Sequence, residues 1–267
     1  MKQGERDLQS PIVALANQKG GVGKTTTAVN LAGELARRGQ RVLLIDGDPQ
    51  GNATTSLGIS KRDLRVTTYD VVMGMVDAGD AIRSTGRERF DLIPASEHLA
   101  GAMVELTALE DREWRLAEAL KQLDRTYDYL LIDCPPSLGL LTLNALCAAG
   151  SVLIALQCEY LALEGLAQLK GTIDRVQQHL NPRLSILGVV MTMYDGRTNL
   201  AQQVVEEVRR HFPHRIFNTL IPRSVRVSEA PSYGQLIAEY DPHSRAAQAY
   251  SLLTDEVVRR MGKKVGV

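Results

Sequence analysis

A glycine-rich segment that also carries lysine and threonine is the part of this sequence best suited to bind a phosphate group. It comprises Gln18, Lys19, Gly20, Gly21, Val22, Gly23, Lys24, Thr25 and Thr26. Backbone N–H groups in such a loop can point at successive phosphate oxygens, and a helix that begins there adds its positive end. The Lys24 ammonium would reach the β- and γ-phosphates, and the Thr25 hydroxyl would bind Mg²⁺. A glycine-rich turn that binds nothing is disfavoured by the Gly-Lys-Thr spacing.

The start of this segment departs from the common phosphate-loop pattern. Gln18 stands where that pattern has glycine, and Lys19 adds a second lysine. A lysine at the mouth of a phosphate site is solvated and need not point inward, so the loop itself does not require this charge. Lys19 is therefore either an ordinary surface lysine or a residue that serves a second subunit.

Two further segments place carboxylates directly after apolar runs. Asp46 and Asp48 follow residues 42–45, and Asp133 follows residues 129–132. If these runs are parallel strands, their carboxyl ends meet at the edge of the sheet where ligands bind. One carboxylate there can hold Mg²⁺ through its water shell, and another can orient an attacking water. The alternative for each aspartate is a cap on the following turn or helix.

Apolar runs alternate along the chain with helical patterns, an order that would bring these carboxylates together. Strands are predicted at 12–16, 41–45, 90–93, 129–132, 152–156, 186–191 and 215–220. Helices are predicted at 24–38, 113–123, 140–148, 161–179, 200–212 and 244–261. Such alternation is typical of a parallel sheet covered on both faces. We expect a flexible segment over 1–10 and one α/β domain over 11–267, with about seven or eight strands; residues 58–112 are the least patterned.

Composition excludes several classes of protein. Apolar residues are 44% and charged residues 23% of the 267, which excludes a disordered or collagen-like chain. Basic and acidic residues number 31 each, so binding to nucleic acid requires a local patch. Cys134, Cys147 and Cys158 form no C-x-x-C pair, which disfavours a zinc site. The uncharged stretch 134–157 is too interrupted to span a membrane, and residues 1–10 contain no secretory signal. We expect a cytoplasmic protein.

Together, these motifs resemble the Soj-like chromosome-partition ATPases (ParA), of the ParA/MinD class of P-loop ATPases. Residues 19–26 match the deviant Walker A signature of that class. Further matching segments are 16–18, 46–54, 133–137, 159–165, 192–198, 221–226 and 229–232. The resemblance is weak over 58–112 and departs at Ser224, where the family pattern has asparagine. It indicates the short form of the family, without an N-terminal DNA-binding domain, so a sequence-specific repressor is not expected.

The resemblance implies a single P-loop NTPase domain and a role for each matching residue. It implies that Lys24 binds phosphates in its own subunit and that Lys19 reaches the partner's nucleotide across an ATP-sandwiched homodimer, as an arginine finger does. It implies that Asp48 positions the attacking water. The other implied nucleotide-binding residues are Gly20, Gly21, Val22, Gly23, Thr25, Thr26, Glu159, Met193, Pro222 and Arg223. The implied Mg²⁺ site consists of Thr25, Asp46 and Asp133.

The resemblance also implies a function. ATP, ADP and Mg²⁺ would be the cofactors of a slow, partner-stimulated ATP hydrolase that drives chromosome or plasmid segregation. Its ATP-bound dimer would bind non-specific double-stranded DNA through Arg197 and Arg226, which makes it nucleoid-associated, and hydrolysis would return it to a monomer. The implied stimulating partner is a ParB (Spo0J-like) centromere-binding protein. For the two arginines, the alternative is a solvated charge or a local salt bridge.

Three other functions remain open from the residues alone. A MinD-like membrane ATPase would need a C-terminal amphipathic helix, but the last helix is short of bulky apolar residues beyond Leu253, Val257 and Met261. We therefore expect no membrane partner. A nitrogenase iron protein shares the loop but needs two cluster-binding cysteines, for which Cys134 and Cys158 lack the context. A nucleotide-gated binding module with negligible turnover is also compatible with the sequence.

Overall fold

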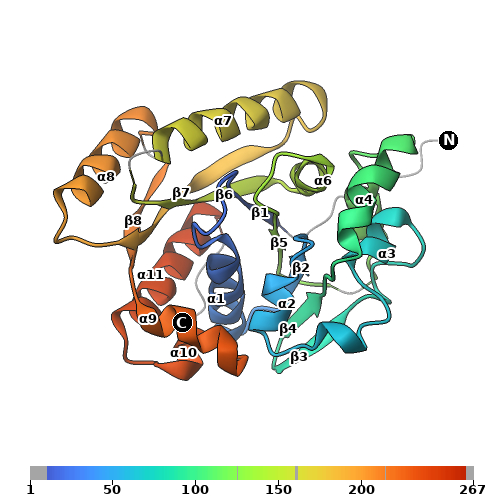
Figure 1. Cartoon of the computed structure of the whole chain (residues 1–267), viewed down its shortest axis with the longest axis horizontal. Coiled ribbons are helices and arrows are strands. Elements are labelled where there is room, and N and C mark those ends of the chain that lie inside the picture. Colours follow the sequence, from blue (N-terminus) through green and yellow to red (C-terminus); the bar gives the residue numbers. More distant parts are fainter. Residues whose placement is uncertain (1–10, 125, 160–161, 214, 263–267) are drawn as a thin grey trace.

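One sheet runs through the described part of the chain and determines where the loops meet (Figure 1). The computed structural model describes residues 11–124, 126–159, 162–213 and 215–262. Within these ranges, eight strands pair in the order β3-β4-β2-β5-β1-β6-β7-β8. They are β1 Ile12–Ala16, β2 Val42–Asp46, β3 Arg83–Arg87, β4 Phe90–Ile93, β5 Tyr129–Asp133, β6 Ser151–Gln157, β7 Ser185–Tyr194 and β8 Ile216–Pro222. All neighbouring strands are parallel except β3, which is antiparallel to β4.

The strands β1, β2 and β5 form the buried centre of the sheet. Each of their residues is buried, and their side chains alternate between two separate apolar cores. In β1, Val13 and Leu15 face one core, whereas Ile12, Ala14 and Ala16 face the other. Because both faces of a parallel sheet are covered, these strands appear in the sequence as unbroken apolar runs.

Helices cover the two faces of the sheet in two groups (Figure 1). One core is closed by α1 Lys24–Arg37, α2 Asn52–Ser56, α10 Ile237–Tyr240 and α11 Arg245–Arg260. The other is closed by α3 Thr68–Met73, α4 Leu99–Glu105, α5 Arg115–Lys121, α6 Leu140–Ala148, α7 Ala162–His179 and α8 Asn199–His211. The short helix α9, Val225–Glu229, follows β8. Because all strands except β3 run in the same direction, the loops that leave their carboxyl ends share one edge of the sheet.

The expected fold class, a single α/β domain with a mostly parallel sheet covered on both faces, is confirmed. Each predicted strand and helix is present within the described residues, with ends that differ by a few residues. Residues 58–112 form α3, β3, β4 and α4, of which the sequence predicted only β4. Strand β3 was missed because its residues are mostly exposed and carry no apolar pattern. The expected N-terminal segment, residues 1–10, lies outside the described residues.

Candidate functional site

The phosphate loop joins the end of β1 to the start of α1, at the carboxyl edge of the sheet. Gly21 and Gly23 have φ angles of 74° and 82°, which residues with a β-carbon rarely adopt. The Gly23 carbonyl accepts a hydrogen bond from the Thr27 N–H at 2.9 Å, so the helix begins directly after the loop. The Thr192 hydroxyl, on β7, donates to the Val22 carbonyl at 2.7 Å and fixes the loop from outside. This arrangement presents the N-terminus of α1 to an anion.

Lys24 lies buried at the base of this loop, with 6% of its surface exposed. Its Nζ donates to the Lys19 carbonyl at 3.4 Å, and no carboxylate of the described residues lies within ion-pair distance of it. Burial lowers the pKa of Lys24 below its ordinary value, whereas the carboxylates of Asp133 and Asp48 act to raise it. A buried ammonium without a close counter-ion is stabilised by a bound anion such as phosphate.

Asp133, at the end of β5, is fully buried and has two carboxylate oxygens without a hydrogen-bond partner among the described residues. Burial and the nearby carboxylate of Asp46 raise the pKa of Asp133 to about 8, although Thr25 and Lys24 oppose the rise. A buried carboxyl group without partners is costly unless a cation or water binds it. The orphaned oxygens of Asp133 therefore fit a cation site at this edge, and hard oxygen donors suit Mg²⁺.

Asp46, at the end of β2, is also fully buried, but its carboxylate is already engaged. Its Oδ2 accepts hydrogen bonds from the Thr54 N–H at 2.8 Å and the Thr54 hydroxyl at 2.6 Å. Its Oδ1 accepts the Asp48 N–H at 3.2 Å. Burial raises the pKa of Asp46 to about 6, and the hydrogen bonds from Thr54 limit the rise. Asp46 is thus positioned to anchor the loop that follows β2, and Asp133 is better placed to face a cation.

Asp48 lies in the loop that Asp46 anchors, with 6% of its surface exposed. Its Oδ1 accepts the Gln50 N–H at 2.9 Å, which closes a tight turn after β2. Its charge acts on the pKa of both Lys24 and Asp133. The structure therefore brings together Lys24, Asp48 and Asp133, which come from three different strand ends, as the sequence predicted.

Lys19 and Glu159 form an ion pair within one chain. Lys19 is at the mouth of the phosphate loop, and Glu159 follows β6. Their side chains remain 47% and 29% exposed, so the pair is at the surface of the site. Solvent-exposed ion pairs contribute little to stability. This pair can therefore open at small cost, which leaves Lys19 available to another group.

The residues expected to border a base lie at the ends of β7 and β8. Met193 adopts a φ of 51°, and the Arg223 N–H donates to the Tyr194 carbonyl at 3.1 Å. A cavity of about 640 Å³ opens between the two strand ends. Its lining includes Tyr194, Pro222, Arg223 and Arg245. The structure thus brings Pro222 and Arg223 together in one cavity, whereas Met193 is not among the residues that line it.

The two arginines expected to bind DNA are exposed and lie at the same end of the sheet. Arg197 follows β7 and is 90% exposed, and its guanidinium donates twice to Asp195, at 2.9 Å and 2.7 Å. Arg226 is on α9, donates to Glu229 at 3.1 Å and lies 6.0 Å from the centre of the Tyr240 ring. Both guanidiniums are therefore accessible, and each has an acidic neighbour that reduces its net charge.

Three buried residues support the site and were assigned no role from the sequence. The Asn17 side chain donates to the Ala155 carbonyl at 2.6 Å and accepts the Lys19 N–H at 2.9 Å. Thr54 holds Asp46, and Thr192 holds the phosphate loop. Each lies inside a family-like motif. Asn17 directly follows β1, where a polar residue is a recognisable signal, whereas Thr54 lies in the short helix α2 and Thr192 lies within β7.

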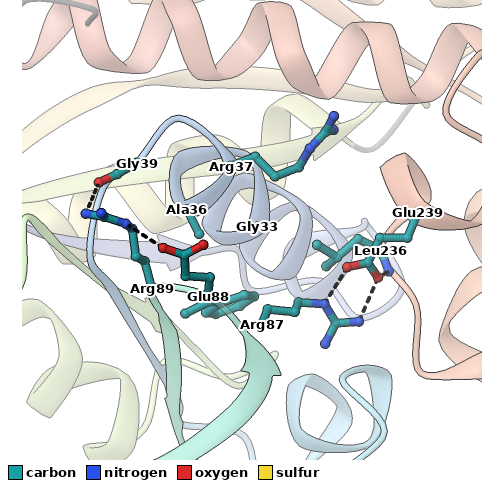
Figure 2. A pocket seen from close by; sticks show the side chains of 10 residues that line it. Gly33, Ala36, Arg37, Gly39, Arg87, Glu88, Arg89, Leu236 and Glu239 are labelled. Atoms are coloured by element: carbon teal, nitrogen blue, oxygen red, sulfur yellow. Dashed lines mark hydrogen bonds and ion pairs between the residues drawn. The ribbon is translucent and has the colours of Figure 1, made fainter.

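A second cavity, of about 420 Å³, lies at the C-terminal end of α1, away from the phosphate loop (Figure 2). Arg87 donates from Nε and Nη2 to the two carboxylate oxygens of Glu239, each at 2.7 Å. Arg89 donates to Glu88 at 3.3 Å and to the Gly39 carbonyl at 3.0 Å. Because these charges are already paired, the cavity offers little to a charged ligand, and its contacts connect β3 and β4 to α10.

Two further kinds of site are absent from the described residues. No helix in the described ranges is long and apolar enough to cross a bilayer. The described residues also hold no group of three or more His, Cys, Asp or Glu placed to bind a metal. Mg²⁺ does not require such a cage, because it keeps several waters and binds phosphates. On α11, Leu253 and Val257 are fully buried, so the apolar stripe of that helix packs in the core.

Known proteins are similar to this chain in sequence and in fold. A family model described as an AAA domain matches residues 10–186. The chain is 56% identical over 246 residues to the sporulation initiation inhibitor protein Soj of Bacillus subtilis. The aligned residues cover 92% of this chain and 97% of Soj. It is 52% identical over 251 residues to the chromosome partitioning protein ParA of Caulobacter vibrioides, with 93% and 94% covered. Cobyrinic acid a,c-diamide synthase of Mycobacterium smegmatis, with bound ADP and magnesium, has a TM-score of 0.84 at 39% identity, with 97% and 99% covered.

Proposed function

This chain belongs to the Soj and ParA family of chromosome-partitioning ATPases, and we propose that its ATP-bound dimer binds DNA and drives chromosome or plasmid segregation. Its cofactors are ATP or ADP with Mg²⁺. One observation carries the proposal: Lys24 of the phosphate loop is buried close to the carboxylates of Asp48 and Asp133, in a chain that is 56% identical to Soj. Such a group suits the cleavage of a phosphoanhydride bond, in which negative charge must be neutralised and a water oriented.

Each member of this group has a distinct task in the proposed hydrolysis. The backbone N–H groups of residues 20–26 would hold the phosphates, and Lys24 would neutralise charge on the β- and γ-phosphates. Thr25, and Asp133 through water, would hold Mg²⁺, which supplies further charge neutralisation when bound. Asp48 would orient the attacking water with the carboxylate oxygen that does not accept from Gln50. Asp46 would keep Asp48 in place through its hydrogen bonds.

The second lysine supports a dimer around two nucleotides. Lys24 already serves the chain's own phosphate loop, and Lys19 is half exposed at its mouth. We infer that Lys19 leaves Glu159 when two subunits meet and binds the partner's nucleotide. The charge then arrives only in the dimer, which would make monomeric hydrolysis slow.

DNA binding is proposed for the edge that carries Arg197 and Arg226. Each dimer would present both arginines twice, and their attraction to phosphates would be non-specific and sensitive to salt. Hydrolysis would separate the subunits and weaken this attraction. A ParB-type partner would stimulate hydrolysis, and the DNA-bound state would place the protein on the nucleoid.

Retention of plasmid DNA by the purified protein tests this proposal. We expect retention with ATP but not with ADP or without nucleotide, and weaker retention at higher salt. Arg226→Ala should lower DNA affinity about tenfold while ATP binding stays unchanged, because a phosphate contact is removed. Arg209→Ala is the matched control, since Arg209 is also exposed but lies on α8.

Two results would contradict the proposal in different ways. Equal DNA retention in every nucleotide state would separate DNA binding from the ATP cycle. No retention in any state would remove the DNA function but leave the ATPase, and binding to anionic liposomes would then test the MinD-like alternative.

A further inference from the structure

A cavity of about 360 Å³ lies beside the loop that carries Asp48, at the carboxyl end of β4. It is formed by the 3₁₀ turn Lys61–Asp63, the start of α3 and the residues that follow β4. Its lining includes Lys61, Arg62, Arg65, Asp70, Ser96 and Glu97. It belongs to neither the phosphate loop nor the cavity at the ends of β7 and β8.

The charges that line this cavity are predominantly positive and largely uncommitted. Arg62 and Arg65 are exposed and form no hydrogen bond or ion pair with any described residue. Of the two acidic residues, Asp70 already accepts the Thr67 N–H at 2.8 Å and the Thr67 hydroxyl at 3.1 Å. Asp70 keeps its negative charge, so Lys61, Arg62 and Arg65 exceed the two carboxylates of the lining by one positive charge. Two free guanidiniums beside a concave surface are suited to bidentate binding of carboxylates or phosphates.

Ser96 gives a second, independent indication of a ligand. It lines the cavity with 4% of its surface exposed, and its hydroxyl has no hydrogen-bond partner among the described residues. A buried hydroxyl without a partner is unfavourable, because it has lost its bonds to water. If the Ser96 side chain turned towards the cavity, a bound anion would give this hydroxyl an acceptor.

One residue of the cavity lining, Lys61, directly contacts the loop that carries Asp48. The Lys61 ammonium donates to the Gln50 carbonyl at 2.9 Å, and the Gln50 N–H donates to Asp48 at 2.9 Å. A β-carbon on Gly51 would lie 2.7 Å from the Ala95 carbonyl and 2.9 Å from the Lys61 side chain. The loop is thus packed tightly against the cavity wall, and a ligand that draws Lys61 away would release the Gln50 carbonyl.

We propose that this cavity binds the carboxylates of an acidic segment of a partner protein, and that Lys61 transmits its occupancy to the Asp48 loop. The binding does not depend on the proposed function, whereas the effect on hydrolysis rests on the proposed role of Asp48. A peptide is favoured over DNA by the shape of the site, because a concave pocket of about 360 Å³ can enclose side-chain carboxylates.

The test measures binding of a fluorescein-labelled hexaglutamate peptide to the full-length protein by anisotropy, with Mg·ATP present so that the phosphate loop is filled. We expect saturable binding to the wild type, weakened about tenfold or more by the double change Arg62→Glu and Arg65→Glu. Arg209→Glu reverses an exposed arginine on α8 that pairs with no side chain in the described ranges, and this variant should bind the peptide like the wild type. Thermal unfolding with ATP verifies that each variant is folded.

Hydrogen exchange measures the link to the loop separately. The peptide should speed exchange of the amides of residues 48–54 in the wild type, because Lys61 leaves the Gln50 carbonyl. Lys61→Gln should speed this exchange without the peptide and leave the peptide little further effect. Binding without faster exchange would overturn the link but not the site. No peptide binding, or equal binding to the double variant, would overturn the site. If the double change instead lowered affinity for duplex DNA, the cavity would belong to the DNA surface. Hydrolysis by Asp48→Ala tests the proposed function independently of these results.

Discussion

Two buried aspartates at the carboxyl edge of the sheet differ in how many hydrogen bonds their carboxylates accept from the described residues. Asp46 and Asp133 are paired in register on β2 and β5, and both are fully buried. Asp46 accepts three hydrogen bonds from Thr54 and Asp48, whereas neither carboxylate oxygen of Asp133 has a partner among the described residues. The same position on two neighbouring strands therefore supports a loop in one case and, in the other, leaves buried carboxylate oxygens that would suit a cation.

The unpartnered carboxyl group of Asp133 should make the nucleotide-free protein less stable as pH rises. Its pKa is raised to about 8, above the ordinary 3.8, so the folded state keeps a proton that the unfolded state releases. Stability should therefore fall between about pH 4 and pH 8, by at most about 1.4 kcal/mol per pH unit, and level off above. Asp133→Asn should remove the slope between about pH 6 and pH 8, above the raised pKa of Asp46, while weakening binding of Mg·ATP. Urea unfolding at pH 5, 7 and 9 measures it, and parallel pH profiles for the two proteins would contradict it.

The sequence predicts the site residues that directly follow or end a strand, because the strands determine their positions. Lys24, Asp48 and Asp133 meet because β1, β2 and β5 are adjacent and parallel, which the apolar runs indicated. The different states of Asp46 and Asp133 could not be predicted. They depend on Thr54, in a helix of five residues that is too short to have a recognisable pattern.

Among the elements, the turn after α2 and the 3₁₀ turn before α10 meet at two glycines. Gly58 and Gly234 have φ angles of 81° and 64°, and a β-carbon on Gly234 would lie 2.9 Å from the Gly58 α-carbon. The Gly234 carbonyl also accepts a hydrogen bond from Arg87 at 2.7 Å. Three segments far apart in the sequence are therefore joined here, and one of them extends from the Asp48 loop.

We expect Gly234→Ala to destabilise the protein more than a change of backbone conformation alone would. Alanine at a positive φ costs about 1 kcal/mol, and the contact with Gly58 should add at least as much again because backbone atoms cannot move aside. Gly39→Ala is the matched control, since Gly39 has a φ of 82° but nothing within 4 Å of its β-carbon position. Equal losses of unfolding free energy in the two variants would show that the contact contributes nothing.

The elements over residues 58–112 show where a sequence pattern fails. Strand β3 is an exposed edge strand with arginine at both ends, so it lacks the apolar alternation of a half-buried strand. Helices α3 and α4 have six and seven residues, fewer than two turns. A hydrophobic period cannot be recognised in so few residues, and tertiary packing determines their structure.

At the scale of the whole molecule, the single chain contains both Lys19 and the residues of its own phosphate site. It pairs Lys19 with Glu159 of the same chain, so its geometry is that of a subunit whose second lysine is not in use. The sequence alone left two roles for Lys19, and a dimer is required to distinguish them. The exchange of Lys19 between subunits can be tested without a structure of the dimer.

Mixing two inactive variants tests whether Lys19 acts on the partner's nucleotide. Lys19→Gln should bind ATP normally but hydrolyse it at least about a hundredfold more slowly, because the transition-state charge is not neutralised. Asp48→Ala should also bind ATP without hydrolysis. In a mixed dimer, the Lys19→Gln subunit keeps Asp48 and faces an intact Lys19, so one of its two sites is complete.

An equal mixture should therefore recover about a quarter of the wild-type rate, since half of randomly paired dimers are mixed and each has one complete site. Each variant alone, at the same total concentration, is the control, and ATP binding by both verifies that they are folded. If Lys19 acted on its own subunit's nucleotide, the Lys19→Gln subunit would lack Lys19 and the Asp48→Ala subunit would lack Asp48. No site in the mixture would then be complete, and the rate would stay at the level of the separate variants.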